Sequence, residues 1–191
     1  MGRYIRRSMS IPLFFSAVKD DRKDIFVDGG VINNYPVKLF DREKYLKDKS
    51  LIRIPKYYEK ENKSLTIKSP KSSPYIYNKE TLGFRLDSAK EIGVFRDGQE
   101  PQHNEIKHFL DYTMQLVKTV LAVQDSQHLH DDDWHRTIYI DTLGVGTTDF
   151  DLSSSRKKEL VDSGEKAANN YLKWWSDVSK DLAINHPSSK K

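Results

Sequence analysis

The most informative stretch of the sequence runs Phe26-Val27-Asp28-Gly29-Gly30-Val31-Ile32-Asn33-Asn34-Tyr35-Pro36. It opens at the end of a short apolar run, residues 25–27, and such a uniform run predicts a strand covered on both faces. Open α/β sheets bind ligands beyond the carboxyl ends of their strands, so Asp28 stands where a catalytic carboxylate is expected. The alternative is a plain Asp-Gly turn, which is common in proteins. We expect Gly29 or Gly30 to hold a positive φ or to lie too close to another backbone for a side chain.

Working outward, two long helices and a second strand are predicted in the later part of the chain. Apolar residues recur at helical spacing over residues 105–127 and again over residues 155–178, where Ser153 to Ser155 offer N-caps. The stripe of the second helix consists of Leu160, Gly164, Ala167, Ala168, Tyr171, Trp175 and Val178. Between the helices, residues 137–141 are β-branched and aromatic, which favours a strand. This mixture of elements predicts an α/β fold, in which the small residues of the second helix let it approach a sheet.

Composition narrows the classes of function. The 191 residues include no cysteine, which excludes disulfides, thiolate metal sites and a cysteine nucleophile. Thirty-two Lys and Arg against 28 Asp and Glu give a net charge of +4, and the two signs are interspersed, so a nucleic-acid partner is not expected. No apolar stretch approaches about 18 residues, and none resembles a signal peptide. These features predict a cytoplasmic protein or one that lies peripherally at membranes.

The chain divides by composition into four segments. Residues 1–41 are apolar and rich in turn signals, and they contain the Asp-Gly-Gly stretch. Residues 42–77 are dominated by Lys, Ser and Tyr, and we expect a surface insertion with little core of its own. Residues 78–186 hold the remaining strands and the two long helices, and residues 187–191 are expected to form a disordered tail.

The first segment resembles the patatin-like phospholipases. Three elements carry the resemblance in the family's order: Ser8-Met9-Ser10-Ile11-Pro12, then Val27-Asp28-Gly29-Gly30, then Asn34-Tyr35-Pro36. The later segments 78–85, 136–142 and 149–152 are also similar to the family, so the resemblance spans nearly the whole chain. It implies a three-layer α/β/α patatin-like fold, present here without its N-terminal part.

The resemblance also implies an activity, which is hydrolysis of lipid esters at a membrane or micelle surface through a serine acyl-enzyme. In that reading Asp28 is the general base of a Ser–Asp dyad, and Asp28, Gly29 and Gly30 form the family's motif. No cofactor and no metal is implied. Ile11, Leu13, Phe14 and Phe15 are candidates for the wall of an acyl pocket, with plain core packing as the equal alternative.

The sequence departs from the family in one respect that bears on activity. None of its serines lies in a Gly-x-Ser-x-Gly pattern, and there is no glycine-rich loop to supply an oxyanion hole. Ser10 has no glycine elbow to expose it and is a poor substitute. We therefore expect a fragment that is inactive alone and that associates with a missing N-terminal half or with itself. The rival hypothesis is a non-catalytic module, derived from such an enzyme, that binds lipid or protein.

The segment 128–135 gathers His128, His130 and His135 around three aspartates. These side chains are suited to metal binding, but their spacing matches no zinc motif. The segment falls between a predicted helix and a predicted strand, and we expect a solvated polar loop there.

Overall fold

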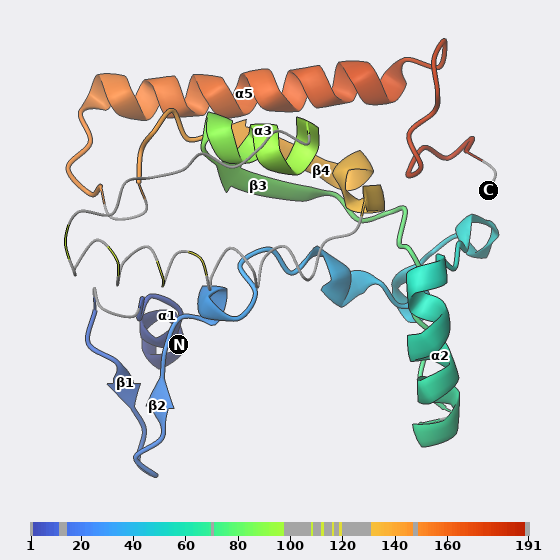
Figure 1. Cartoon of the computed structure of the whole chain (residues 1–191), viewed down its shortest axis with the longest axis horizontal. Helices are drawn as coiled ribbons and strands as arrows, with labels where there is room; N and C mark the ends of the chain where they lie inside the picture. Colours follow the sequence, from blue (N-terminus) through green and yellow to red (C-terminus); the bar gives the residue numbers. More distant parts are fainter. Residues whose placement is uncertain are drawn as a thin grey trace. The chain divides into compact units, whose positions relative to one another are not determined.

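The computed structural model describes residues 2–11, 15–69, 71–97, 131–146 and 149–189, together with the single positions 108, 112, 116 and 119. Contacts between residues divide the chain into two compact units. The first comprises Met1–Pro36 and Glu105–His130, and the second comprises Val37–Asn104 and Asp131–Lys191. Figure 1 labels the helices and strands of both units.

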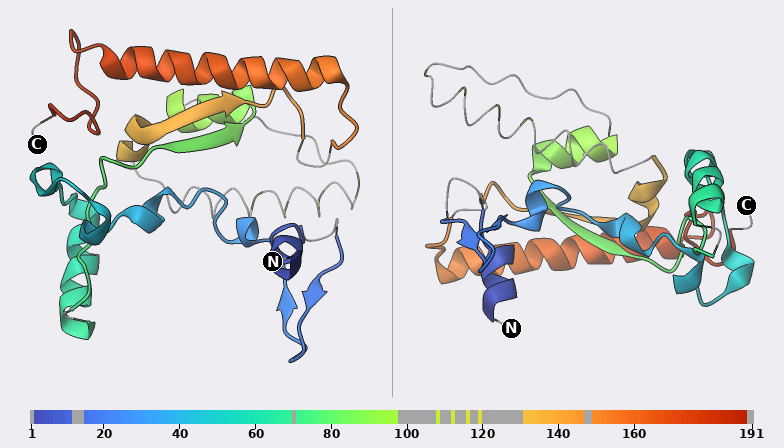
Figure 2. Two further views of the ribbon diagram at one scale, coloured as in Figure 1. Left: turned by 180° about the vertical axis from the view of Figure 1, so that it is seen from behind. Right: turned by 90° about the horizontal axis from the view of Figure 1, so that it is seen from below.

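The first unit contains a short helix and a small hairpin. Helix α1 spans Gly2–Ser8, and strands β1 (Val18–Lys19) and β2 (Ile25–Phe26) pair antiparallel with Val18 opposite Phe26. The loop between them is closed by the Asp20 carboxylate, which accepts hydrogen bonds from the backbone N–H groups of Arg22 and Asp24. Figure 2 shows the two strands side by side. A 3-10 turn, η1 (Gly29–Val31), follows the hairpin.

The prediction of a strand buried on both faces at residues 25–27 is wrong. Ile25 is 64% exposed and Val27 is 41% exposed. Among the described residues, β2 pairs with β1 in a two-stranded sheet, and a hairpin this small covers little of its own apolar surface. Phe26 is partly covered by the Arg7 guanidinium, which lies 3.7 Å from the centre of its ring.

The second unit is built on a parallel pair of strands. β3 (Gly83–Asp87) pairs with β4 (Thr137–Asp141) in continuous register, from Gly83 opposite Thr137 to Asp87 opposite Asp141. Helix α3 (Ala89–Asp97) follows β3 and contacts both strands, while helix α5 (Ser154–Ser176) packs along β4. Parallel pairing requires a long crossover, and the mixture of helices with this small sheet confirms the α/β class. The strand predicted at residues 137–141 is confirmed as β4.

Helix α5 confirms the second predicted helix. The Ser153 hydroxyl accepts a hydrogen bond from the Arg156 backbone N–H at 3.2 Å and caps the helix start. Nearly three turns further on, the Ser163 hydroxyl donates to the Asp141 carbonyl at 2.8 Å and ties the helix to the end of β4. A Cβ added to Gly164 would lie 3.9 Å from the Ile140 side chain, so the predicted stripe faces β4 at this position. Val178, predicted as the last member of the stripe, lies beyond the end of α5 and is 66% exposed.

The segment 42–77 contains more structure than its composition suggests. It forms two 3-10 turns, η3 (Glu43–Tyr45) and η4 (Lys49–Leu51), and the 13-residue helix α2 (Lys56–Lys68). Just before it lies the turn η2 (Val37–Phe40). Five of its residues are buried in the second unit: Leu46, Pro55, Tyr58, Ile76 and Tyr77. The expectation that this segment has little core of its own is therefore wrong. Its many lysines hide the few aromatic and aliphatic residues that are buried.

Two further expectations concern the helix at residues 105–127 and the tail at residues 187–191. Of the helix expected at 105–127, only positions 108, 112, 116 and 119 lie among the described residues, and the last three are helical. The expected tail differs at Ser189, whose carbonyl and hydroxyl oxygens accept hydrogen bonds from Lys79 Nζ at 2.5 and 2.9 Å. Within the described ranges, no helix has the length and apolar content needed to cross a membrane.

The packing of α5 predicts that Gly164→Ala stabilises the protein. The new methyl group would make an ordinary contact with Ile140 at 3.9 Å, and alanine removes the entropic cost of glycine in a helix interior. We expect the free energy of unfolding in urea to rise by about 0.5–1 kcal/mol. The reverse change on the same stripe, Ala168→Gly, should lower it by at least as much. A loss of stability in Gly164→Ala would mean that α5 lies closer to β4 than described.

Candidate functional site

In the first unit, Asp28 lies at the start of a tight turn. Its carboxylate oxygen Oδ1 accepts a hydrogen bond from the Gly30 backbone N–H at 2.7 Å and so caps η1. The other oxygen, Oδ2, accepts no hydrogen bond from any residue that the structure describes. The side chain is half-buried. Asp28 is thus held in place through one oxygen while the second stays available.

The first two elements of the patatin-like pattern meet at Asp28. Its backbone N–H donates to the Ser10 carbonyl at 3.0 Å, which joins the Ser-Met-Ser-Ile-Pro element to the Asp-Gly-Gly element. The Ser10 side chain is 2% exposed, and its hydroxyl donates to the Arg6 carbonyl at 2.8 Å. Ser10 therefore closes the end of α1, in keeping with its poor prospects as a nucleophile.

The two glycines serve a different purpose from the one predicted. Among the described glycines only Gly144 has a positive φ, so neither Gly29 nor Gly30 uses the left-handed region. A Cβ on Gly29 would meet open space. A Cβ on Gly30 would lie 3.0 Å from the Asn34 side-chain oxygen and 3.1 Å from the Asp28 carboxylate. A side chain at position 30 would therefore crowd two polar side chains, and its three nearest neighbours include no backbone atom.

The candidate acyl-pocket residues are only partly described. Ile11 is half-buried, and Phe15 is 43% exposed. Leu13 and Phe14 lie outside the described residues. The role of these four side chains in binding an acyl chain stays a prediction.

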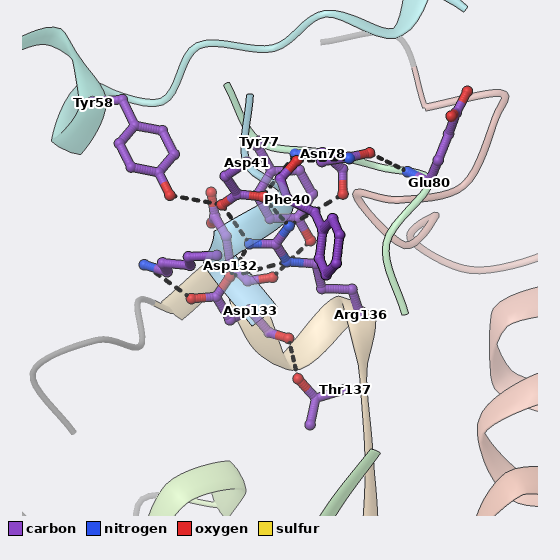
Figure 3. A network of polar contacts seen from close by, with 11 residues as sticks. Phe40, Asp41, Tyr58, Tyr77, Asn78, Glu80, Asp132, Asp133, Arg136 and Thr137 are labelled. Atoms are coloured by element: carbon purple, nitrogen blue, oxygen red, sulfur yellow. Dashed lines mark hydrogen bonds and ion pairs between the residues drawn. The ribbon is translucent and has the colours of Figure 1, made fainter. Parts of the chain in front are cut away.

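In the second unit, the Arg136 guanidinium forms the centre of a buried polar cluster (Figure 3). It pairs with both oxygens of Asp41, at 2.5 and 2.8 Å, and with Oδ1 of Asp133 at 2.7 Å. Arg136 and Asp41 are completely shielded from solvent, and Asp133 is 1% exposed. The expectation of a solvated loop at 128–135 is thus wrong for Asp133. Its carboxylate points inward because Arg136 and Lys38 need a counter-charge.

Further contacts extend this cluster to other elements. The Tyr58 hydroxyl of α2 donates to Asp41 Oδ2 at 2.6 Å. Lys38 Nζ lies 3.2 Å from Asp133 Oδ2. The Tyr77 ring lies against the Arg136 guanidinium, whose central carbon is 4.3 Å from the ring centre. The cluster holds two cations and two carboxylates, so its charges balance.

The electrostatics fix the protonation states of these groups. Burial alone would lower the pKa of Arg136, but the hydrogen bonds and charge of Asp41 outweigh it and raise that pKa. Burial and the neighbouring Asp41 carboxylate raise the pKa of Tyr58, so its proton stays in place. Burial lowers the pKa of Lys38, and the Asp133 carboxylate partly offsets this effect. The cluster thus forms a structural clasp, in which ion pairs and hydrogen bonds join segments far apart in the sequence.

Sequence reasoning missed this clasp. Asp41 and Arg136 are 95 residues apart, and no sequence pattern links the two positions. The available signal was an arginine immediately before an apolar strand, where a charged group becomes buried and needs a partner.

Comparison with known proteins supports the resemblance drawn from Asp28 and its neighbours. Residues 2–41 match the family described as patatin-like phospholipase. The chain is also 24% identical, over 179 residues, to the uncharacterized protein YqhO of Bacillus subtilis (strain 168). This match covers 92% of the chain but 47% of YqhO, so the chain spans about half the length of that curated relative. No solved structure matches the chain significantly.

The clasp predicts a large loss of stability in Asp41→Ala. This change leaves the buried Arg136 guanidinium without its main counter-charge, which typically costs about 3–5 kcal/mol. Urea unfolding followed by circular dichroism measures the effect. Asp162→Ala, which removes an exposed ion pair with Lys158 on α5, is the control and should change stability little. Equal effects of the two substitutions would show that the buried pair carries no special weight.

A second prediction concerns pH. His135 stacks on Trp134 with ring centres 3.9 Å apart, and its Nδ1 accepts a hydrogen bond from the Ile184 N–H. Burial lowers the pKa of His135 in the folded state, so just below pH 6.5 the unfolded chain binds this proton and the folded chain does not. Stability is therefore lost as pH falls from about 6.5 towards the folded-state pKa.

Thermal unfolding between pH 7.5 and 5.5 tests this effect. His135→Gln should flatten the fall in melting temperature that the unmodified protein shows. His186→Gln is the matched control, because His186 also stacks on a tryptophan, Trp175, with ring centres 4.7 Å apart. An unchanged pH profile in His135→Gln would exclude His135 as its source.

Proposed function

We propose that this chain supplies the aspartate-bearing part of a serine-type lipid acyl hydrolase with a three-layer α/β/α patatin-like fold. The carrying observation is that the patatin-like match over residues 2–41 contains Asp28, held through one oxygen with the other available. In the proposed reaction Asp28 accepts the proton of a serine hydroxyl as that hydroxyl attacks the ester carbonyl. The bond between the serine oxygen and the carbonyl carbon forms, the ester C–O bond breaks, and Asp28 returns the proton to the leaving alcohol. Asp28 then takes a proton from a water molecule that attacks the acyl-enzyme, and returning that proton to the serine oxygen releases the acid and restores the hydroxyl.

The serine and the oxyanion hole come, in this proposal, from a polypeptide that corresponds to the unmatched half of YqhO. Two observations support it. No serine among the 191 residues has the Gly-x-Ser-x-Gly setting that exposes such a nucleophile. In addition, the chain matches only 47% of its relative's length.

Exposed apolar side chains within each unit support the presence of further strands. In the first unit Ile25 and Ile32 are 64% and 69% exposed. In the second, Phe84 and Leu86 on one face of β3 are 60% and 68% exposed. Two-stranded sheets are marginal by themselves, and added strands would cover these groups. Self-association of the chain is the alternative way to cover them.

The isolated chain should be inactive. A chimera tests whether the aspartate and the serine come from different parts. We would fuse the part of YqhO outside the matched region to this chain and assay hydrolysis of p-nitrophenyl butyrate. Asp28→Asn should lower turnover at least ~100-fold, because the amide cannot accept the serine proton. The substitution is structurally mild, since an asparagine oxygen still accepts the Gly30 N–H and caps the turn.

Asp24→Asn is the matched control, an isosteric change in the exposed hairpin loop that should leave turnover unchanged. A folded, active chimera that tolerates Asp28→Asn would remove Asp28 from the mechanism. A folded chimera without activity would instead favour the rival hypothesis of a non-catalytic module. Labelling of the isolated chain by a fluorophosphonate probe at Ser10 would overturn the division between two parts.

A further inference from the structure

The positive charge of the protein is concentrated in one segment. Residues 42–77 contain ten Lys or Arg and four Asp or Glu, which gives this segment a charge of +6. Since the whole chain carries +4, the other 155 residues carry −2. A local excess of this size attracts anions, even though the overall balance is only mildly basic.

Part of this charge surrounds an open cavity of about 670 Å³ in the second unit. Four basic side chains line it: Arg42, Lys44, Lys49 and Lys71. The hydroxyl-bearing Ser72 and Ser73 also line it, and Glu43 is the single acidic residue in the lining. The Glu43 carboxylate lies 3.0 Å from Lys49 Nζ and neutralises that lysine. The remaining cations give the cavity a net charge of +3.

The walls of the cavity are tied together before any ligand arrives. The Arg42 guanidinium donates to the Ser73 carbonyl at 2.6 Å and stacks on the Tyr75 ring, 3.6 Å from its centre. The Lys44 N–H donates to the Ser73 hydroxyl at 2.9 Å, and the Glu43 N–H donates to the Pro74 carbonyl at 3.0 Å. These bonds hold the 42–44 and 73–75 stretches side by side. Lys44 and Lys71 form no ion pair with any described residue, so both ammonium groups are available.

Exposed aromatic rings adjoin the same cations. Phe40 and Tyr45 are 52% and 45% exposed, and their rings meet edge to face with centres 5.6 Å apart. Lys44 Nζ lies 4.7 Å from the Tyr45 ring centre. Aromatic rings beside lysines are typical of surfaces that rest at the headgroup level of a membrane.

We propose that this cavity binds a phosphate group, and that the headgroup of an anionic phospholipid at a membrane surface supplies it. Serine hydroxyls and lysine ammonium groups are suitable donors for phosphate oxygens, and the adjoining rings favour a lipid source over a soluble one. The site lies wholly within the second unit and does not rest on the hydrolase proposal.

Flotation with vesicles tests this site on the full 191-residue chain. Vesicles of phosphatidylcholine with one fifth phosphatidylglycerol should carry the protein upward, and vesicles of phosphatidylcholine alone should not. The double variant Lys44→Gln/Lys71→Gln should weaken binding to the anionic vesicles about 30-fold, since two interfacial charges are lost. Lys44→Glu/Lys71→Glu should abolish the binding. Neither lysine side chain makes a bond that the fold depends on, and circular dichroism checks each variant.

The matched control is Lys157→Glu/Lys173→Glu, which makes the same change in net charge on the exposed surface of α5. It should retain most of the binding. Equal losses in the two charge-reversal variants would overturn the site, because only overall charge would then matter. Absence of binding to anionic vesicles would overturn the lipid source.

Equilibrium dialysis with inorganic phosphate and with glycerol 3-phosphate distinguishes the soluble source. Binding of these ions that is lost in Lys44→Glu/Lys71→Glu, without vesicle binding, would support the phosphate site and assign it to a free phosphate. Absence of binding in both assays would overturn the proposal. Neither assay measures ester hydrolysis, so a negative result here would not bear on the role proposed for Asp28.

Discussion

The second unit depends on one buried ion pair, between the Arg136 guanidinium and the Asp41 carboxylate. Moving either charge out of water is costly, and the cost is offset only when geometry and further hydrogen bonds are good. Here the two terminal guanidinium nitrogens each donate to one carboxylate oxygen of Asp41, and Asp133 supplies the second negative charge. A pair of this kind tolerates little displacement. It therefore holds the backbone around each partner at a defined position.

The position of the pair connects it to the register of the sheet. Arg136 is the residue before β4, and the Thr137 hydroxyl that opens the strand donates to the Asp133 carbonyl at 2.6 Å. Asp41 also accepts the backbone N–H of Asn78, on the approach to β3, while the Asn78 amide donates to the Phe40 carbonyl. A single carboxylate thus anchors the segments that lead into both parallel strands. Helix α5 then follows β4, because Ser163 and Gly164 contact its last residues.

This dependence explains what the sequence could and could not predict. β4 and α5 were predictable because each has a local signal, a β-branched run in one and a capped apolar stripe in the other. The apolar run at residues 25–27 led to a wrong prediction of a buried strand. Such a run shows that burial of its side chains is favourable, but it does not show which other element would cover them. For Asp133 the sequence led to a wrong prediction of solvent exposure. Its neighbours in the sequence are polar, but Lys38, one of the cations it pairs with, is distant in the chain. Asp28 lies at the start of a turn, which the sequence offered only as the alternative to the end of a buried strand. The close approach of the Asp28 and Asn34 side chains to Gly30 is a contact visible only in three dimensions.

The two aspartates differ in the one property that proton transfer requires. An ionised carboxylate has about four sites at which it accepts hydrogen bonds. Asp41 fills all four, with two from Arg136, one from the Tyr58 hydroxyl and one from the Asn78 N–H. Such a group has no free site for a substrate proton, however deeply it is buried. Asp28 uses one site for Gly30 and keeps Oδ2 free of described partners, with its turn already formed. Burial alone would favour Asp41 as a reactive group, whereas its four hydrogen bonds assign Asp41 to the fold. Oδ2 of Asp28 has no described partner, which is what the role proposed for Asp28 requires.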